Sequence, residues 1–321
     1  SLNWDIGGAL SLNASVVLSG VGNTLDVLAQ RVTMAQATGI STNNGAMRLE
    51  ADAGALVLEA VSAGTASVAL VASTSITDLD ALSLITANVL WLNAGTGIGS
   101  KSGTPAVVNA LNTSVVTLAL NNTQGDVFIS EANGLVVDAV SVVTAQTTTG
   151  QGLNLGAGSL VLNATGDLTL NATTGSVTAT GGGNVLLSSG GAMAVNAAVN
   201  ADSGAVSLMA SGAQVFAAAG DVSGGAGVDV QAGAAVNGVG VSMQAGTVFT
   251  TLGGAIRVQA LAGDVAVGIL DARTAADRSG ATLTAQVSWG DVSVVAHGAI
   301  TDVGNSTALN IYAGDLRLEA G

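Results

Sequence analysis

The chain has 321 residues, one proline, no cysteine and a formal net charge of −14 from 21 acidic and 7 basic side chains. The lack of cysteine excludes disulfides, thiolate nucleophiles and cysteine-based zinc sites. The acidic balance argues against a nucleic-acid partner, whose phosphates need clustered Lys and Arg. Membrane insertion is not expected either, because Gly, Thr, Ser and Asn interrupt every long uncharged stretch.

The first notable element, Val32 to Ala51, returns near the other end of the chain as Val241 to Ala260. Identical residues stand at 8 of these 20 positions at an offset of 209. The correspondence continues, so that blocks 32–95 and 241–321 are duplicates with a repeat period of about 209–226 residues and an insertion in the second copy. Such self-similarity is typical of a solenoid cut from a longer array.

A shorter unit runs through the whole chain. Glycine and a turn residue precede an alternation of apolar and small polar residues that ends in alanine, as in residues 54–60, 158–164, 166–172, 204–210 and 314–320. Alternation with a period of two predicts half-buried strands. The side chains expected to point into the core are Leu56, Leu58, Leu160, Leu162, Leu168, Leu170, Val206 and Leu208.

Between Gly158 and Gly183 the units recur every 8 or 9 residues, which is too short for strand-helix-strand units. We therefore predict an all-β fold, a right-handed parallel β-helix (β-solenoid) in which residues 1–321 form one continuous, elongated single rod. With two or three strands per coil, the chain would make roughly 13 to 16 coils, about 4.8 Å apart. An antiparallel sandwich or barrel is the alternative, less favoured because aromatic residues are only 2%.

Parallel β-helices also host polysaccharide-cleaving enzymes, so paired carboxylates need attention. Three pairs stand close in sequence, namely Asp78 with Asp80, Glu50 with Asp52, and Asp271 with Asp277. Glycoside hydrolysis needs two carboxyl groups that flank a cleft, and seven scattered aromatic residues cannot line a long sugar groove. We interpret these acids as solvated turn residues and predict no catalytic residues and no enzymatic activity.

Six Gly-Asp pairs open strands or turns, at Asp126, Asp167, Asp221, Asp264, Asp291 and Asp315. Stacking at equivalent positions of adjacent coils would bring such carboxylates about 4.8 Å apart, and calcium would relieve the repulsion. The nonapeptide typical of calcium rolls has a single match, Gly224 to Asp229, without a tandem neighbour. Structural calcium is therefore only weakly supported, and we expect no other cofactor, no cofactor-binding residue and no catalytic metal.

Two further features lie near the C-terminal end of the sequence. His297, the only histidine, stands in a turn sequence, where we expect an exposed side chain. The second copy of the duplicated block also carries an insert at residues 270–285, which gathers Arg273 and Arg278 with Asp271 and Asp277. Its alanine-rich sequence predicts a short helix or a protruding loop that either faces solvent or contacts a partner.

The run Leu90 to Ser100, with the strands at 113–120 and 125–137 and the repeated Gly-Asp/Ser-Leu-x-Leu-x-Ala units, resembles the filamentous haemagglutinin-like giant bacterial surface exoproteins. The resemblance implies an interior shaft segment with a structural or adhesive, non-enzymatic role, located extracellularly at the bacterial cell surface. Partners would be neighbouring repeats, through end-to-end or lateral self-association, and an unidentified receptor. The alternative is a β-helical polysaccharide-binding or polysaccharide-degrading module.

Overall fold

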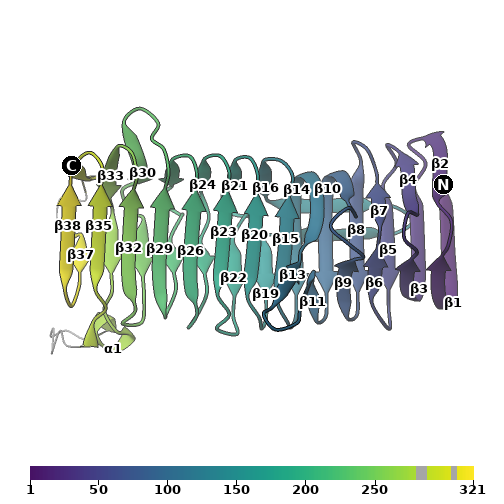
Figure 1. Cartoon of the computed structure of the whole chain (residues 1–321), viewed down its shortest axis with the longest axis horizontal. Helices are drawn as coiled ribbons and strands as arrows, with labels where there is room; N and C mark the ends of the chain where they lie inside the picture. Colours follow the sequence, from purple (N-terminus) through teal and green to yellow (C-terminus); the bar gives the residue numbers. More distant parts are fainter. Residues whose placement is uncertain (280–287, 305–308) are drawn as a thin grey trace. The chain divides into compact units, whose positions relative to one another are not determined.

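The computed structural model describes residues 1–279, 288–304 and 309–321. This part is almost entirely β structure, with one short helix, and its strands stack in parallel into about 13 coils (Figure 1). The predicted all-β parallel β-solenoid is thereby confirmed. Contacts divide the chain into two units, Ser1–Ala164 and Thr165–Gly321, each of which is a solenoid. The prediction that residues 1–321 form one continuous rod stays a prediction.

Unit 1 has three parallel ladders of strands, one for each side of the coil. The first runs β1-β3-β5-β8-β10-β14, the second β1-β3-β6-β9-β11-β15-β20, and the third β2-β4-β7-β10-β14-β15. The strands are β1 Leu2–Leu12, β2 Val16–Val21, β3 Leu25–Met34, β4 Gly39–Asn43, β5 Met47–Ala51, β6 Leu56–Leu58, β7 Ala60–Ser62, β8 Ser67–Ala72, β9 Ser75–Asp78, β10 Ile85–Ala94, β11 Gly97–Ile98, β12 Ser100–Ser102, β13 Val107–Asn109, β14 Leu111–Asn122, β15 Val127–Glu131, β16 Leu135–Val137, β17 Ala139–Val143, β18 Thr147–Gln151, β19 Leu153–Leu155 and β20 Leu160–Ala164.

Unit 2 is more regular, with ladders β23-β26-β29-β32-β35-β38, β21-β24-β27-β30-β33-β36 and β22-β25-β28-β31-β34-β37. Its elements are β21 Leu168–Leu170, β22 Val177–Ala179, β23 Val185–Ser189, β24 Met193–Val195, β25 Val199–Asn200, β26 Ala205–Ala210, β27 Gln214–Phe216, β28 Val222–Ser223, β29 Gly227–Ala232, β30 Val239–Met243, β31 Val248–Thr250, β32 Ala255–Ala260, β33 Asp264–Val267, β34 Ile269–Asp271, α1 Ala275–Ser279, β35 Val292–Ala296, β36 Ile300–Asp302, β37 Ile311–Tyr312 and β38 Leu316–Ala320.

The core of each unit is a narrow column of aliphatic side chains. All eight predicted core residues have an exposed fraction of 0%, which confirms the interpretation of the alternating units. Aliphatic layers suit this fold because each coil stacks its inward side chains on those of the next coil, about 4.8 Å away. In the described ranges no helix has the length and apolar content that crossing a bilayer requires.

The duplicated blocks adopt the same succession of strands and turns, each within its own unit. The second part of β3, β4 and β5 correspond to β30, β31 and β32. The hydroxyl of Thr42 donates to the carbonyl of Gly45 over 2.5 Å, and Thr251 makes the same bond to Gly254 over 2.6 Å. The repeated threonine therefore closes the repeated turn.

Glycine at this turn is required by the coil below. A Cβ atom on Gly45 would lie 1.8 Å from the carbonyl oxygen of Asn23, and one on Gly254 would lie 2.3 Å from that of Ala226. Any side chain there would collide with backbone, which cannot move aside. This contact explains why the glycine recurs in both blocks.

The insertion in the second block lies in one connection between strands. In unit 1, residues 63–66 join β7 to β8, whereas in unit 2 residues 272–291 join the corresponding strands β34 and β35. The short helix α1 forms part of this insert. Residues 280–285 of the predicted insert fall outside the described residues.

Candidate functional site

The Gly-Asp carboxylates bond to the backbone of the following coil. An aspartate oxygen accepts the N–H at the start of the next strand in each ladder, over 2.7–3.3 Å, in the pairs Asp126–Ser159, Asp167–Ala192, Asp221–Val248, Asp264–Ala299 and Asp291–Asp315. Only Asp291 and Asp315 are thus neighbours in adjacent coils. Elsewhere the stacked carboxylates for which calcium was considered do not occur, and each bond instead ties one coil to the next.

The one match to a calcium-binding nonapeptide has a different use as well. Asp229, its acidic residue, accepts two hydrogen bonds from the guanidinium of Arg257, over 2.7 and 2.8 Å. Its carboxylate is therefore engaged by a cation of the protein. No group of three or more His, Cys, Asp or Glu side chains that could hold a metal occurs among the described residues.

In each of the first two acidic pairs, the two carboxylates lie in different environments. Asp78 is buried, whereas Asp80 closes a surface loop by accepting the N–H groups of Leu82 and Ser83 over 2.8 and 3.1 Å. Glu50 forms an ion pair with Arg48, whereas Asp52 is exposed. Neither pair presents two carboxyl groups to a common cleft. The expectation of solvated turn acids is right for Asp52 and wrong for Asp78, which the fold buries.

Two buried carboxyl groups in unit 1 have perturbed acidities. Asp78 accepts hydrogen bonds from the side chains of Asn109 and Asn112 over 2.8 and 3.0 Å. Glu131, with an exposed fraction of 0%, accepts bonds from the Thr113 hydroxyl over 2.6 Å and from the N–H of Val115 over 3.1 Å. Burial raises the pKa of both groups, and these hydrogen bonds only partly oppose it. The sequence did hold a signal for Glu131, because it follows Val127 and Ile129 at a spacing of two and takes the place of the alanine that ends the repeated unit.

Glu131 should make the stability of unit 1 depend on pH. Its pKa is raised above the ordinary value of 4.5, so its stabilising contribution is fully present below pH 4.5 and is lost as pH rises through the folded pKa. Amide exchange at Val115, measured against pH, should show this loss in the native chain but not in Glu131→Gln. Glu319→Gln, at an exposed position, is the matched control. A folded pKa of Glu131 at or below 4.5 would contradict the expectation.

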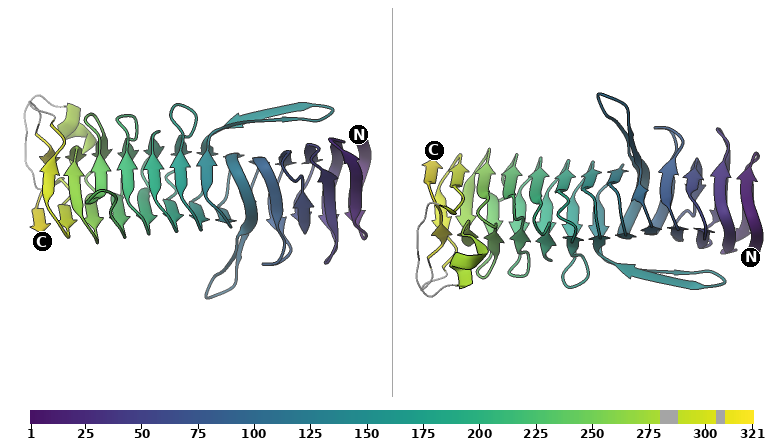
Figure 2. Two further views of the ribbon diagram at one scale, coloured as in Figure 1. Left: turned by 90° about the horizontal axis from the view of Figure 1, so that it is seen from above. Right: turned by 90° about the horizontal axis from the view of Figure 1, so that it is seen from below.

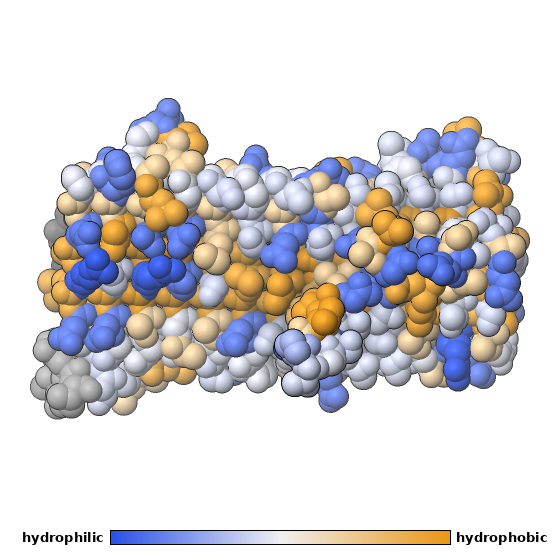
Figure 3. Space-filling model, in the orientation of Figure 1, coloured by the Kyte–Doolittle hydropathy of each residue, from blue (hydrophilic) through white to orange (hydrophobic). Residues whose placement is uncertain are grey.

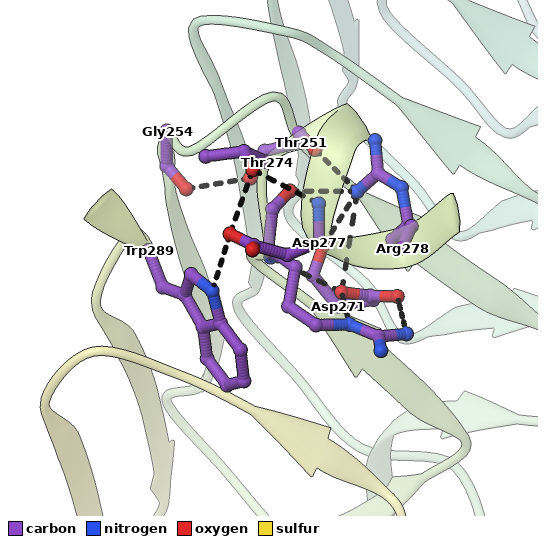
Figure 4. A network of polar contacts seen from close by, with 8 residues as sticks. Thr251, Gly254, Asp271, Thr274, Asp277, Arg278 and Trp289 are labelled. Atoms are coloured by element: carbon purple, nitrogen blue, oxygen red, sulfur yellow. Dashed lines mark hydrogen bonds and ion pairs between the residues drawn. The ribbon is translucent and has the colours of Figure 1, made fainter. Parts of the chain in front are cut away.

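The third acidic pair belongs to a polar network that fixes the insert to unit 2 (Figure 4). Asp271, which is buried, accepts two bonds from Arg273 over 2.9 and 2.7 Å. Asp277 accepts bonds from the Thr274 hydroxyl over 2.7 Å and from the indole N–H of Trp289 over 2.8 Å. These two carboxylates therefore hold the insert in place and do not form an open acid–base pair. The expectation of a solvated turn acid is wrong for Asp271, which is buried in its bonds to Arg273.

Arg273 and Arg278 complete the attachment of the insert. Arg278 donates to the carbonyls of Thr251 and Arg273 over 2.5 and 2.9 Å, which links α1 to the preceding coil. The guanidinium carbon of Arg273 lies 3.9 Å from the ring centre of Tyr312, a cation–π contact. The predicted Arg and Asp residues are thus brought together, and they contact one another. His297, by contrast, is exposed in a turn, as expected.

A second surface attachment was not foreseen from the sequence. Strands β17 and β18 form an antiparallel hairpin, residues 139–151, which leaves the coil of unit 1 and lies along the outside of the stack (Figure 2). We call it the arm. Its inner side chains Val140 and Val142 are buried and pack with Ala69, Trp91 and Ala119 in a small apolar cluster. The arm therefore covers a face of the solenoid that would otherwise meet solvent.

The surface beneath the arm is one ladder of outward side chains. Asp26, Arg48, Ala69, Trp91 and Ala119 stand opposite one another in successive coils. The hydroxyl of Thr144, near the tip of the arm, donates to Asp26 over 2.6 Å. Asp26 also accepts a bond from Arg48 over 2.8 Å, and Arg48 pairs with Glu50 as well. The arm thus buries an ion-pair network as well as an apolar cluster.

A Gly150→Ala substitution should loosen the arm. A Cβ atom at position 150 would lie 2.0 Å from the Trp91 ring, so ring and arm must separate. Overpacking of this kind costs about 1–3 kcal/mol, which corresponds to a loss of protection of roughly 5- to 150-fold. Hydrogen exchange at Val140 and Val142 measures it. Thr149→Ala, on the exposed face of the arm, should leave exchange unchanged, and equal effects of both variants would contradict the arrangement.

Comparison with models of protein families, with curated proteins and with solved structures found no match for this chain. The resemblance to haemagglutinin-like exoproteins therefore stays a prediction.

Proposed function

We propose that this chain is a non-enzymatic structural segment of a large bacterial surface protein, in which the solenoid holds fixed attachments on its outer face. The observation that carries the proposal is the use of the carboxylates. Asp126, Asp167, Asp221 and Asp264 join coils, and Asp271 and Asp277 anchor the insert. Acids that hold coils and attachments together serve rigidity, whereas hydrolysis requires acids facing a substrate.

One cavity in unit 1 also supports a structural role. The trough next to the buried Asp78 and Glu131, about 300 Å³ in volume, is lined by residues 81–84 and by Asn112, Thr113, Ser130 and Ala132, and none of these is ionisable. Perturbed carboxyl groups gathered in a concave pocket would favour catalysis. Here the two carboxyl groups with raised pKa, Asp78 and Glu131, do not line the trough, and each accepts hydrogen bonds from backbone or side-chain donors of the protein.

Partners of such a segment would be further copies of its own repeat, joined end to end or laterally, together with a surface receptor. The internal duplication supports this proposal, since the same succession of strands and turn contacts occurs in both units. A repeat that contacts mainly its neighbours extends by adding copies. A structural calcium ion would have to bind carboxylates other than those that already bond to protein groups.

Two measurements test the proposal. Antibodies against the chain should label intact cells of the source organism, and labelling only after lysis would contradict a surface location. The purified chain should release no new reducing ends or unsaturated products from acidic and neutral polysaccharides. Turnover that is abolished by Asp78→Asn or Glu131→Gln would replace the structural proposal with an enzymatic one.

A further inference from the structure

Unit 2 presents a second copy of the Asp–Arg pair that unit 1 hides under the arm. Arg257 stands opposite Asp229 in the adjacent coil, as Arg48 stands opposite Asp26. The side chains of Arg48 and Asp26 are 8% and 5% exposed, whereas those of Arg257 and Asp229 are 42% and 35% exposed. The same construction is therefore closed in one unit and open to solvent in the other.

Amide side chains extend the open pair. Gln231 and Gln259 lie opposite each other in the same two coils, next to Asp229 and Arg257. The Gln259 carbonyl oxygen accepts a bond from Arg257 over 2.9 Å. We call Asp229, Gln231, Arg257 and Gln259 the polar face. Figure 3 shows hydrophilic side chains gathered over β29 and β32, and again over β38.

A trough of about 270 Å³ adjoins the polar face. Besides Asp229 and Arg257, two valines and four small residues line it, namely Val206, Val228, Ala205, Ser207, Gly227 and Ala255. Small side chains leave the backbone accessible and allow a ligand to approach the sheet closely. The trough and the polar face together offer a largely apolar hollow with a carboxylate, a guanidinium and two carboxamides beside it.

The arm shows which chemistry such a pair accepts. In unit 1 the group seated on the aspartate is a hydroxyl, that of Thr144, which donates to Asp26 over 2.6 Å. In unit 2 the oxygens of Asp229 each accept one bond from Arg257 and retain further lone pairs. Among the described residues, no acceptor bonds the amide nitrogens of Gln231 and Gln259. A ligand hydroxyl group that donates a hydrogen bond thus finds an acceptor in the carboxylate. A ligand hydroxyl group that accepts one finds donors in the two carboxamides.

We propose that the polar face binds a neutral polysaccharide. A chain of sugar rings supplies closely spaced hydroxyl groups that both donate and accept, which matches this set of side chains. The charge of the polar face is balanced, with one aspartate and one arginine, so it offers no excess positive charge for a sulfated or carboxylated polymer. The net charge of −14 repels polyanions further.

Binding of the whole chain to soluble neutral glucan, mannan, galactan and xylan tests the proposal by titration calorimetry, with heparin and polygalacturonate as polyanions. At least one neutral polymer should bind, and the polyanions should not. Arg257→Gln and Asp229→Asn should each weaken binding about tenfold, as expected for loss of a hydrogen bond to a charged group. Arg31→Gln, an exposed arginine in unit 1, is the matched control and should bind as the native chain does.

Several outcomes would overturn the inference. The inference is wrong if no neutral polymer binds, if Arg257→Gln and Asp229→Asn leave binding unchanged, or if the chain prefers the polyanions. A hairpin peptide of residues 138–152 serves as a competing probe. If it binds the polar face and no neutral polysaccharide does, the surface recognises polypeptide instead. Reducing-end assays on the same mixtures separate binding from turnover, so that failure here leaves the structural role standing.

Discussion

Replacement of Arg48 by methionine is expected to lower the free energy of unfolding of unit 1 by about 3–5 kcal/mol, because the buried Asp26 and the partly buried Glu50 then lose their common cation. Asp26 and Arg48 have side chains only 5% and 8% exposed, and Glu50 pairs with the same guanidinium. Methionine keeps much of the side-chain volume, so the loss measures the ion pairs more than the packing. Denaturant unfolding and hydrogen exchange in β3 and β5 provide the measurement.

Arg257→Met is the matched control, because it removes the duplicate of the same residue from a solvated surface. Its pair with Asp229 is 42% and 35% exposed, and exposed pairs contribute about 0–1 kcal/mol. The two substitutions therefore differ in what covers the arginine and in the second carboxylate, Glu50, that Arg48 holds. Equal losses for Arg48→Met and Arg257→Met would show that the arm does not shield the network of unit 1 from water.

The double substitution Arg48→Met with Asp26→Leu adds a second check. Removing Asp26 as well takes away the more buried of the two carboxylates that Arg48→Met leaves unpaired, so part of the lost stability should return. Thr144 then loses its acceptor at the tip of the arm. Hydrogen exchange should accordingly become faster in the arm even where the coils themselves recover.

The strands and core could be predicted from the sequence because both follow from local alternation. Glycine followed by a residue pattern of period two marked Leu160 and Leu162 as inward, and both are fully buried. The repeated Met34/Met243 and Thr42/Thr251 likewise pointed to a repeated turn. Each of these signals is read within ten residues of sequence, so it does not depend on which distant segments pack against the strand.

The arm could not be predicted in this way. Residues 139–143 alternate like the strands of the coil, and nothing local distinguishes an antiparallel hairpin from another turn of the solenoid. The arm is held in place by contacts with residues that are distant in the sequence. Val142 packs beside Trp91, and Thr144 bonds to Asp26, 118 residues earlier. The available signal was the pair of small apolar residues Ala69 and Ala119 at outward positions, where side chains are usually larger or polar. Such residues indicate that another segment covers this face.

The pairing of charges was hidden for a related reason. Arg48 and Arg257 stand at equivalent positions of the duplicated blocks, but their partners lie one coil below, 22 residues earlier in one case and 28 in the other. Coil length varies with each loop, so spacing in the sequence does not identify neighbours in the ladder. The insert is different, because Asp271 and Arg273 are only two residues apart and their pairing is local.

Phe216→Ala is expected to be the most disruptive apolar substitution in unit 2. Phe216 and Phe249 are both fully buried, and their ring centres lie 4.9 Å apart at an interplanar angle of 71°. Phe216 belongs to β27 and Phe249 to β31, so the pair joins two different sides of the solenoid. Truncation of a buried phenylalanine costs about 3–5 kcal/mol, and the cavity would open where two ladders meet.

Thermal and denaturant unfolding should show this loss, and hydrogen exchange should place it in β27, β30 and β31. Val215→Ala, at the neighbouring outward position with 41% exposure, is the control and should change stability by no more than about 0.5 kcal/mol. Combining Phe216→Leu with Phe249→Leu in a double-mutant cycle isolates the ring contact, for which about 0.5–1.5 kcal/mol is expected. Because coils contact mainly their neighbours, the destabilisation should weaken with distance from β27. A uniform loss of protection throughout unit 2 would instead show that its coils unfold as a single cooperative block.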